Sequence, residues 1–224
     1  MTFPLEFPAA AFRCRANGLA FDLDPNNDAE ISSPTWGGLV QSIGQGRRLW
    51  RMRYDLVTLR EADAESVISA IRRLRGTTRR FRAINPLRRV AQAYPNGYAG
   101  LVRAGGGAFD GTATLFAIGE ALDTVTLSGL PAGFVLTPGD FMSWAFGGTR
   151  QALHAVVVGG VANGSGIVSV TLEPTIIPGV ETGATVALLN PWCKASLVKG
   201  SVRYARLVNR RHDISYGAIQ DIRP

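Results

Sequence analysis

The stretch WRMRYDLVTLREADAESVISAIRRLRGTTRRFRAINP, residues 50–86, contains the pattern that decides the fold of this chain. Residues 49–56 alternate, because Trp50, Met52, Tyr54 and Leu56 are apolar whereas the residues between them are charged. A period of two indicates a strand with one apolar face on the core and one charged face. Residues 79–84 indicate a second strand, which ends at Asn85-Pro86.

Between these two strands the sequence predicts one helix. Thr58 and Glu61 have the spacing of a capping box. Acidic side chains then come first and basic side chains last, as the helix dipole favours: Glu61, Asp63 and Glu65 against Arg72, Arg73 and Arg75. Val67, Ile68, Ile71 and Leu74 form an apolar stripe at helical spacing, and Gly76 follows as a stop. We therefore expect Ile71 to lie buried under the sheet.

Residues 93–195 have a different texture, rich in Gly, Thr, Val and Ala and poor in charge. Short β-prone runs alternate there with turn signals such as Pro138-Gly139-Asp140 and Asn163-Gly164-Ser165-Gly166. The runs are 124–127, 141–146, 153–158, 167–172 and 185–189. Such spacing indicates a small β-barrel or sandwich. Two further strand candidates, 203–207 and 216–222, follow near the end.

Charge divides the chain in the same way. Residues 1–92 hold 15 basic and 9 acidic residues, residues 93–195 hold 3 and 6, and residues 196–224 hold 6 and 2. Two basic outer parts around an acidic middle suit one domain with a second inserted into it. The predicted fold is mainly β with one principal α-helix, in which 1–92 plus 196–224 form one domain and 93–195 form an inserted small β-barrel or sandwich.

The targeting and redox signals are sparse. The first residues show no basic region followed by an apolar run, so we expect no signal peptide and folding in the cytosol. No apolar run approaches the length of about 20 residues that a membrane-spanning helix needs. Cys14 and Cys193 suit a reducing compartment as two small buried side chains, and the sequence leaves open whether they meet.

Catalytic, cofactor-binding and metal-binding residues are not predicted. A hydrolase needs a base beside its nucleophile, but we interpret His154 as a strand residue with a polar neighbour and His212 as part of an exposed turn. The acidic stretch 22–30 lacks the glycine of a calcium loop. The Gly-rich residues 104–108 are not followed by a lysine or a helix signal, which argues against a phosphate loop. We expect the chain not to be an enzyme.

Several motifs occur in a familiar order. Leu74-Arg75-Gly76, Phe81 and Asn85-Pro86 close the first unit, and Leu136-Thr137-Pro138-Gly139-Asp140-Phe141 opens a strand in the middle. The run 156–172, with Glu173-Pro174 after it, and the closing run Tyr216-Gly217-Ala218-Ile219-Gln220 complete the set. Together they resemble the distal tail proteins and related minor tail proteins of long-tailed bacteriophages.

This resemblance implies a structural role in a virion. Such proteins have a tail-tube-like β-sandwich domain with an inserted small β domain and form homo-hexameric rings. The ring joins the tail tube protein to the baseplate hub protein at the distal end of the tail, and DNA passes through its lumen without specific binding. Such a subunit is made in the cytoplasm of the host bacterium. The chain has no room for a large carbohydrate-binding extension, which favours a bare ring.

The arginines provide the candidate contact residues. We expect Arg51, Arg53, Arg79 and Arg82 to point away from the core and to pair with acids of an adjacent subunit, because arginine suits interface ion pairs. The alternatives are a solvated face and a nucleic-acid-binding β-barrel protein, which needs aromatics to stack on the bases. A carbohydrate-binding host-adhesion module is a further alternative, with exposed Trp144, Phe146 and Trp192 as its platform.

Overall fold

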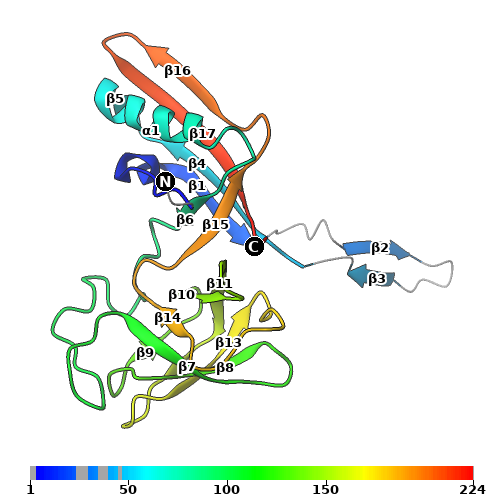
Figure 1. The fold of residues 1–224 in the computed structure, drawn as a ribbon, viewed down its shortest axis with the longest axis vertical. Helices are drawn as coiled ribbons and strands as arrows, with labels where there is room; N and C mark the ends of the chain where they lie inside the picture. Colours follow the sequence, from blue (N-terminus) through cyan, green and yellow to red (C-terminus); the bar gives the residue numbers. More distant parts are fainter. Residues whose placement is uncertain (1–3, 24–29, 35–39, 45–46, 224) are drawn as a thin grey trace. The chain divides into compact units, whose positions relative to one another are not determined.

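The computed structural model describes residues 4–23, 30–34, 40–44 and 47–223. The predicted fold class is confirmed: the described chain is mainly β with one α-helix, and it forms a seven-stranded antiparallel sheet and a closed six-stranded barrel (Figure 1). Two short pairs accompany them, β2 (Glu30–Pro34) with β3 (Val40–Gly44) and β9 (Val135–Leu136) with β12 (Gly160–Val161). No helix in the described ranges is long and apolar enough to span a membrane.

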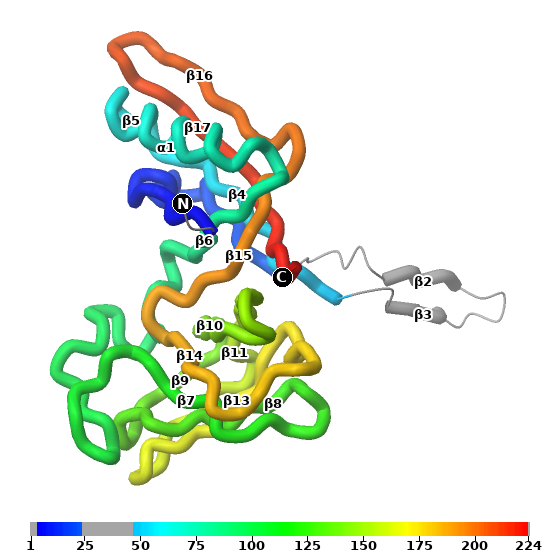
Figure 2. The backbone as a smooth tube through the Cα atoms, viewed as in Figure 1, coloured from blue at the N-terminus to red at the C-terminus, as the bar shows by residue number. Residues whose placement is uncertain are grey.

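The chain divides into two compact units, which alternate along the sequence (Figure 2). Residues 7–79 and 196–220 form what we call the helix unit, and residues 1–6, 80–195 and 221–224 form the barrel unit. The second break, at 195/196, coincides with the predicted boundary, whereas the first lies at 79/80 and not at 92/93. The domain boundaries that the sequence indicates stay a prediction.

The sheet follows an order that the sequence alone does not indicate. Its main path is β1 (Cys14–Leu23), β4 (Trp50–Leu56), β17 (Arg211–Gln220), β15 (Trp192–Leu197) and β6 (Phe81–Ile84). In addition, β16 (Arg203–Leu207) and β5 (Leu59–Arg60) pair with β17. The last long strand of the chain therefore lies beside β4, and β1 pairs with the other side of β4.

Alternation on β4 works as predicted. Trp50, Met52, Tyr54 and Leu56 are buried, whereas Arg51 and Arg53 are exposed. On the buried face Tyr54 stacks on Tyr216, with 4.9 Å between the ring centroids. The Tyr216 hydroxyl donates a hydrogen bond of 2.6 Å to the carbonyl of Ala11, which belongs to a short 3-10 turn, η1 (Ala9–Phe12). The aromatic pair thus forms the centre of the helix-unit core.

Helix α1 (Glu61–Arg73) confirms the predicted element but corrects two details. The N-cap residue is Arg60, without a side-chain cap, and the Thr58 hydroxyl donates instead to Asp213, 2.9 Å away. The predicted capping box is therefore wrong, because a tertiary partner takes the hydroxyl. Ile71 is only half-buried. Val67, Ile68 and Leu74 of the predicted stripe, together with Ala64 and Ala70, form the buried face of the helix.

This correction changes which helix substitution should matter. Leu74 is fully buried, so Leu74→Ala is expected to lower the free energy of unfolding by about 2–5 kcal/mol. Ile71→Ala should cost less, because part of the Ile71 side chain is already in water. Urea unfolding followed by circular dichroism measures both losses. Equal losses would show that the two side chains contribute equally to the core.

The barrel closes in the order β10 (Phe141–Phe146), β11 (Arg150–Val158), β13 (Val168–Glu173), β8 (Thr124–Ser128), β7 (Thr112–Ile118) and β14 (Thr185–Ala187). The five predicted runs coincide with five of these strands, and β7 is the strand that the sequence did not indicate. The core of the barrel contains an aromatic cluster, in which Tyr94 stacks on Phe134 with 4.5 Å between the ring centroids. Trp144 on β10 stacks on His154 on β11, with 4.4 Å between the ring centroids. The predicted inserted β domain is thus a closed barrel with a dense core.

Candidate functional site

Both histidines of the chain are buried. His154 is buried, and its Nδ1 lies 2.6 Å from the carbonyl oxygen of Pro174. His212 is also buried, on β17, so the predicted exposed turn at this residue is wrong: the turn comes earlier, at Asn209 and Arg210. Within the described ranges no group of three or more His, Cys, Asp or Glu side chains is placed to hold a metal ion. Residues 24–29 of the acidic stretch 22–30 lie outside those ranges.

Both cysteines are free thiols. Burial raises the pKa of Cys14 to about 11 and raises the pKa of Cys193 further. Since the thiolate is the reactive form, neither thiol is activated as a nucleophile near neutral pH.

The candidate site lies on the sheet face of the helix unit that points away from the core. Cross-strand pairing places Arg53 opposite Gly217, and Asp55 opposite Ser215, which in turn lies opposite Arg203 on β16. The neighbouring rows of this face add Arg51, Arg211 and Asp213. Three strands of one sheet, β4, β16 and β17, bring these side chains together from two parts of the sequence, 51–55 and 203–217. The face is rich in arginine but also contains acidic side chains.

A pocket of about 290 Å³ opens on this face. Its lining consists of Arg53, Val198, Gly200, Ser201, Arg203, Ser215, Tyr216 and Gly217. A Cβ atom at Gly217 would lie 3.2 Å from the Cβ atom of Ser201, so the glycine keeps the floor of the pocket open. The Ser201 hydroxyl accepts a hydrogen bond of 3.0 Å from the N–H of Gly217 and lies 2.7 Å from the carbonyl of Val198. The floor is therefore held by short hydrogen bonds.

The two arginines of the pocket differ from most others in the helix unit. Arg13 is paired with Asp63, Arg15 with Asp213, and Arg206 with Glu61 and Glu65. In contrast, neither Arg53 nor Arg203 makes a side-chain hydrogen bond or ion pair within the part of the chain that the structure describes. Both are exposed. Their guanidinium donors are available to an external acceptor.

An internal ion pair borders the pocket face. The Arg15 guanidinium lies 2.5 Å from the Asp213 carboxylate and donates a hydrogen bond that lowers the pKa of Asp213 below its usual value. The hydroxyl of Thr58 donates a second hydrogen bond to the same carboxylate. Three elements, β1, β17 and the residues before β5, are thereby joined by one carboxylate.

This pair should make stability sensitive to acid. A carboxyl group whose pKa is lower in the folded state contributes stability above its unfolded pKa of about 3.9, and loses it as the pH falls through the folded pKa. Asp213→Asn should therefore be less stable than the wild type at neutral pH, and the difference should shrink below about pH 4. Melting temperatures recorded from pH 7 to pH 2 measure it.

Arg15→Gln serves as the matched variant, because the two substitutions remove the same contact. The double variant should then lose little more than either single variant. A difference between Asp213→Asn and the wild type that stays constant down to pH 2 would contradict the role of the ion pair.

The four predicted contact arginines fall into three surroundings. Arg51 and Arg53 lie on the exposed sheet face of the helix unit. Arg79 precedes β6 and donates a hydrogen bond of 3.1 Å to the carbonyl of Arg73 at the end of α1. Arg82 pairs with Glu6 and lies over the Trp192 ring, 4.1 Å from its centroid. Arg79 and Arg82 thus make contacts within the chain at its surface, and the interface role of all four arginines stays a prediction.

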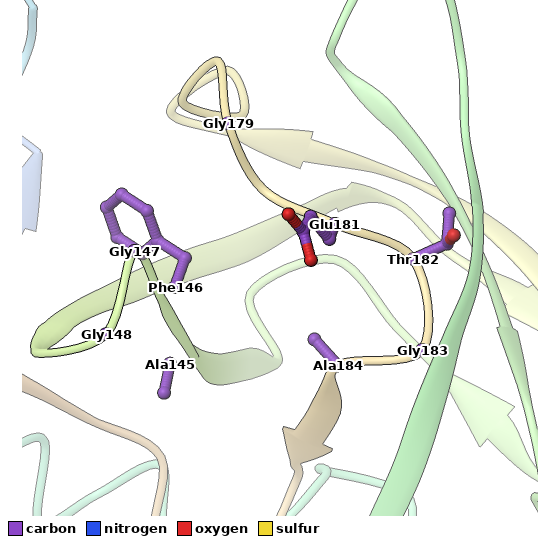
Figure 3. A pocket seen from close by; sticks show the side chains of 9 residues that line it. All are labelled: Ala145, Phe146, Gly147, Gly148, Gly179, Glu181, Thr182, Gly183 and Ala184. Atoms are coloured by element: carbon purple, nitrogen blue, oxygen red, sulfur yellow. The ribbon is translucent and has the colours of Figure 1, made fainter.

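A second pocket, of about 500 Å³, lies on the barrel (Figure 3). Phe146 and Glu181 are its largest side chains, and glycines and alanines form most of the rest. Trp144 and Phe146 are buried, and Trp192 is half-buried beneath Arg82. These three aromatic residues therefore do not form the exposed platform that a sugar would stack on.

The sequence missed Arg203, Ser201 and Gly217 as site residues. A glycine within the β-prone run 216–222 was an available signal, because glycine in a strand often marks a close approach of other groups. The pairing of β16 with β17 had no such signal.

No protein-family model matches this chain, and a comparison with curated proteins finds no match.

Proposed function

We propose that this chain is a structural subunit of a phage-type tail tip, a distal-tail-like protein that forms a homo-hexameric ring. In this role the ring joins the tail tube to the baseplate hub at the distal end of the tail and lets DNA pass. The order of motifs along the sequence supports the family. The observation that carries the assembly is the open, exposed edge of the sheet at β16.

Strand β16 has exposed apolar side chains beside its two arginines. All five of its residues are exposed, and Tyr204 and Leu207 are 58% and 40% exposed. Val208, in the turn that follows, is 85% exposed. A sheet edge with unpaired backbone groups and apolar side chains is a template for another chain, and proteins generally cover or charge such edges. We infer that a partner covers this edge.

The helix unit also offers a second edge. Within it the strands run β1, β4, β17, β16, and among the described strands β1 pairs with β4 alone. A ring of identical subunits needs two different contact faces on each copy, one for each neighbour. Two open edges on opposite sides of one sheet supply such faces.

The other two functions receive less support. A carbohydrate-binding module lacks its predicted platform, since Trp144 and Phe146 are buried. A nucleic-acid-binding surface would need aromatic side chains among its arginines. On the arginine face of the sheet, however, Asp55 and Asp213 lie among the arginines, and Tyr54 and Tyr216 are buried.

Assembly of the purified full chain tests the proposal. We expect closed six-fold rings in electron micrographs as the concentration rises from micromolar to millimolar. Val208→Asp should prevent them, because an exposed apolar side chain that becomes buried in a contact cannot be replaced by a charge without cost. Val102→Asp is the control, since Val102 is also exposed, at 59%, but lies on the barrel unit.

The contrary outcomes are specific. A chain that stays monomeric at millimolar concentration, or one that forms only two-fold dimers, would contradict the ring. Rings that form equally well with Val208→Asp would show that the contact lies elsewhere on the subunit and not at β16.

A further inference from the structure

The pocket on the sheet face brings together two positive charges that the chain itself does not neutralise. Arg53 comes from β4 and Arg203 from β16, and both line the same concavity of about 290 Å³. Neither has a hydrogen-bonding or ionic partner among the described residues. Two guanidinium groups in one small pocket repel each other, and an anion between them would remove that repulsion. A planar guanidinium matches the two oxygens of a carboxylate or phosphate group.

The shape of the pocket suits a small group. Gly200 and Gly217 leave its floor without side chains, and the hydrogen bonds of Ser201 fix the backbone around them. Because the Ser201 hydroxyl is already used by the backbone of Val198 and Gly217, the arginines are the donors for a ligand. The pocket therefore selects by charge and by the planar geometry of its two arginines.

The rest of the face favours a carboxylate over a nucleic acid. A polyanion lying across the face would meet the Asp55 and Asp213 carboxylates, which the strand pairing places on the same side as Arg53 and Arg203. The aromatic rings of Tyr54 and Tyr216 are buried and cannot stack on bases. A single acidic side chain, in contrast, needs only the pocket itself, where Arg53 and Arg203 are the charged residues of the lining.

Charge also indicates where the carboxylate comes from. By sequence the helix unit holds 16 basic and 9 acidic side chains, a net charge of +7, and the barrel unit holds 8 of each. Neither unit of a second copy of this chain therefore has a net negative charge. Electrostatic complementarity favours a partner of opposite charge. A different protein with an acidic surface fits this requirement better.

We propose that the Arg53–Arg203 pocket is a carboxylate-binding site that takes an aspartate or glutamate side chain of a different, acidic protein. The identity of that partner rests on the proposed function: in a tail tip it would be a protein stacked on the ring. The carboxylate site itself does not depend on ring formation. Its failure and the failure of the ring are therefore measured separately.

A labelled hexaglutamate peptide serves as the probe for the purified full chain. Fluorescence anisotropy at fixed low salt should show binding that weakens at least about tenfold in Arg53→Gln and in Arg203→Gln, since each removes one arm of a bidentate site. Arg203→Lys should fall between wild type and Arg203→Gln, because lysine keeps the charge and loses the planar fork. Circular dichroism confirms that each variant is folded.

Arg211→Gln is the matched control. Arg211 is exposed on the same face of the sheet, on β17 opposite Leu207 of β16, and it does not line the pocket. The variant therefore loses the same charge without touching the site. Its affinity for hexaglutamate should change by less than about twofold, as a general electrostatic contribution. An equal loss in Arg211→Gln and Arg203→Gln would overturn the proposal in favour of non-specific attraction.

Two further outcomes would also overturn it. A short DNA duplex whose binding exceeds that of hexaglutamate and depends on Arg203 but not on Arg211 would assign the pocket to nucleic-acid phosphate. Self-association of the wild type that Arg203→Gln abolishes, measured by light scattering without peptide, would assign it to a second copy of the chain. Rings that form while hexaglutamate does not bind would reject the pocket and leave the proposed function intact.

Discussion

Trp144→Ala is expected to lower the free energy of unfolding of the barrel unit by about 3–5 kcal/mol, the range for truncating a large buried aromatic side chain. Trp144 is 1% exposed and stacks on His154, with 4.4 Å between the ring centroids and 11° between the planes. It lies on β10, which pairs with both β11 and β14, so the cavity would open where the barrel closes. Urea unfolding followed by far-ultraviolet circular dichroism measures the loss.

Two companion variants separate packing from other effects. Phe116→Ala removes an aromatic ring that is 59% exposed on the same barrel, and it should change stability by less than about 0.5 kcal/mol. The Trp144 indole N–H has no hydrogen-bond partner among the described residues. Trp144→Phe should therefore cost less than Trp144→Ala, because it keeps most of the volume and loses no hydrogen bond. Similar losses for alanine at 144 and 116 would show that Trp144 is not part of a packed core.

Gly166→Ala is expected to destabilise the barrel unit by about 2–5 kcal/mol, because backbone strain and overpacking act together. Gly166 has a φ of +72°, which favours glycine. A Cβ atom there would lie 2.2 Å from the carbonyl oxygen of Leu130. That segment of backbone is fixed by two hydrogen bonds, from Leu130 N–H to Gly166 and from Ala104 N–H to Leu130, and cannot move without breaking them.

Gly164→Ala, two residues earlier in the same turn, is the control. A Cβ atom at Gly164 would meet no atom within 4 Å, and the variant should be neutral or slightly stabilising because it restricts the unfolded chain. Thermal melts of the two variants and the wild type give the comparison. A Gly166→Ala protein as stable as Gly164→Ala would mean that the turn adopts another backbone conformation in solution.

Local patterns predicted the elements well where one residue type repeats on one face. The alternation from Trp50 to Leu56 placed the strand and its buried side correctly, and the acid-to-base gradient placed α1. The barrel strands were found because short β-prone runs are separated by turn residues, and β10 was predicted with its observed bounds, Phe141–Phe146.

The failures share a cause. Thr58 was expected to cap the helix and instead bonds to Asp213, 155 residues away. His212 follows two arginines and was expected in an exposed turn, but β17 begins one residue before it and directs its ring to the core. Ile71 lies at the edge of the apolar stripe of the helix, where one side of its side chain is exposed to water. Each outcome depends on a residue that is close in space but distant in sequence, which a local sequence pattern does not identify.

Hydrophobic periodicity and turn residues act within a few positions along the chain. The sequence was therefore enough to predict the mainly β fold class, the one helix, the β-rich middle and the outward direction of Arg51 and Arg53, but it left a barrel and a sandwich both open. Tertiary structure alone decided which strands pair and therefore which charges meet. Arg53 and Arg203 share a pocket only because β4 and β16 lie on either side of β17. Arg82 has an ionic partner only because Glu6 lies beside it, and its guanidinium group lies over the ring of Trp192. Strand pairing depends on the apolar surface that the whole core buries, and no short stretch of sequence specifies that surface.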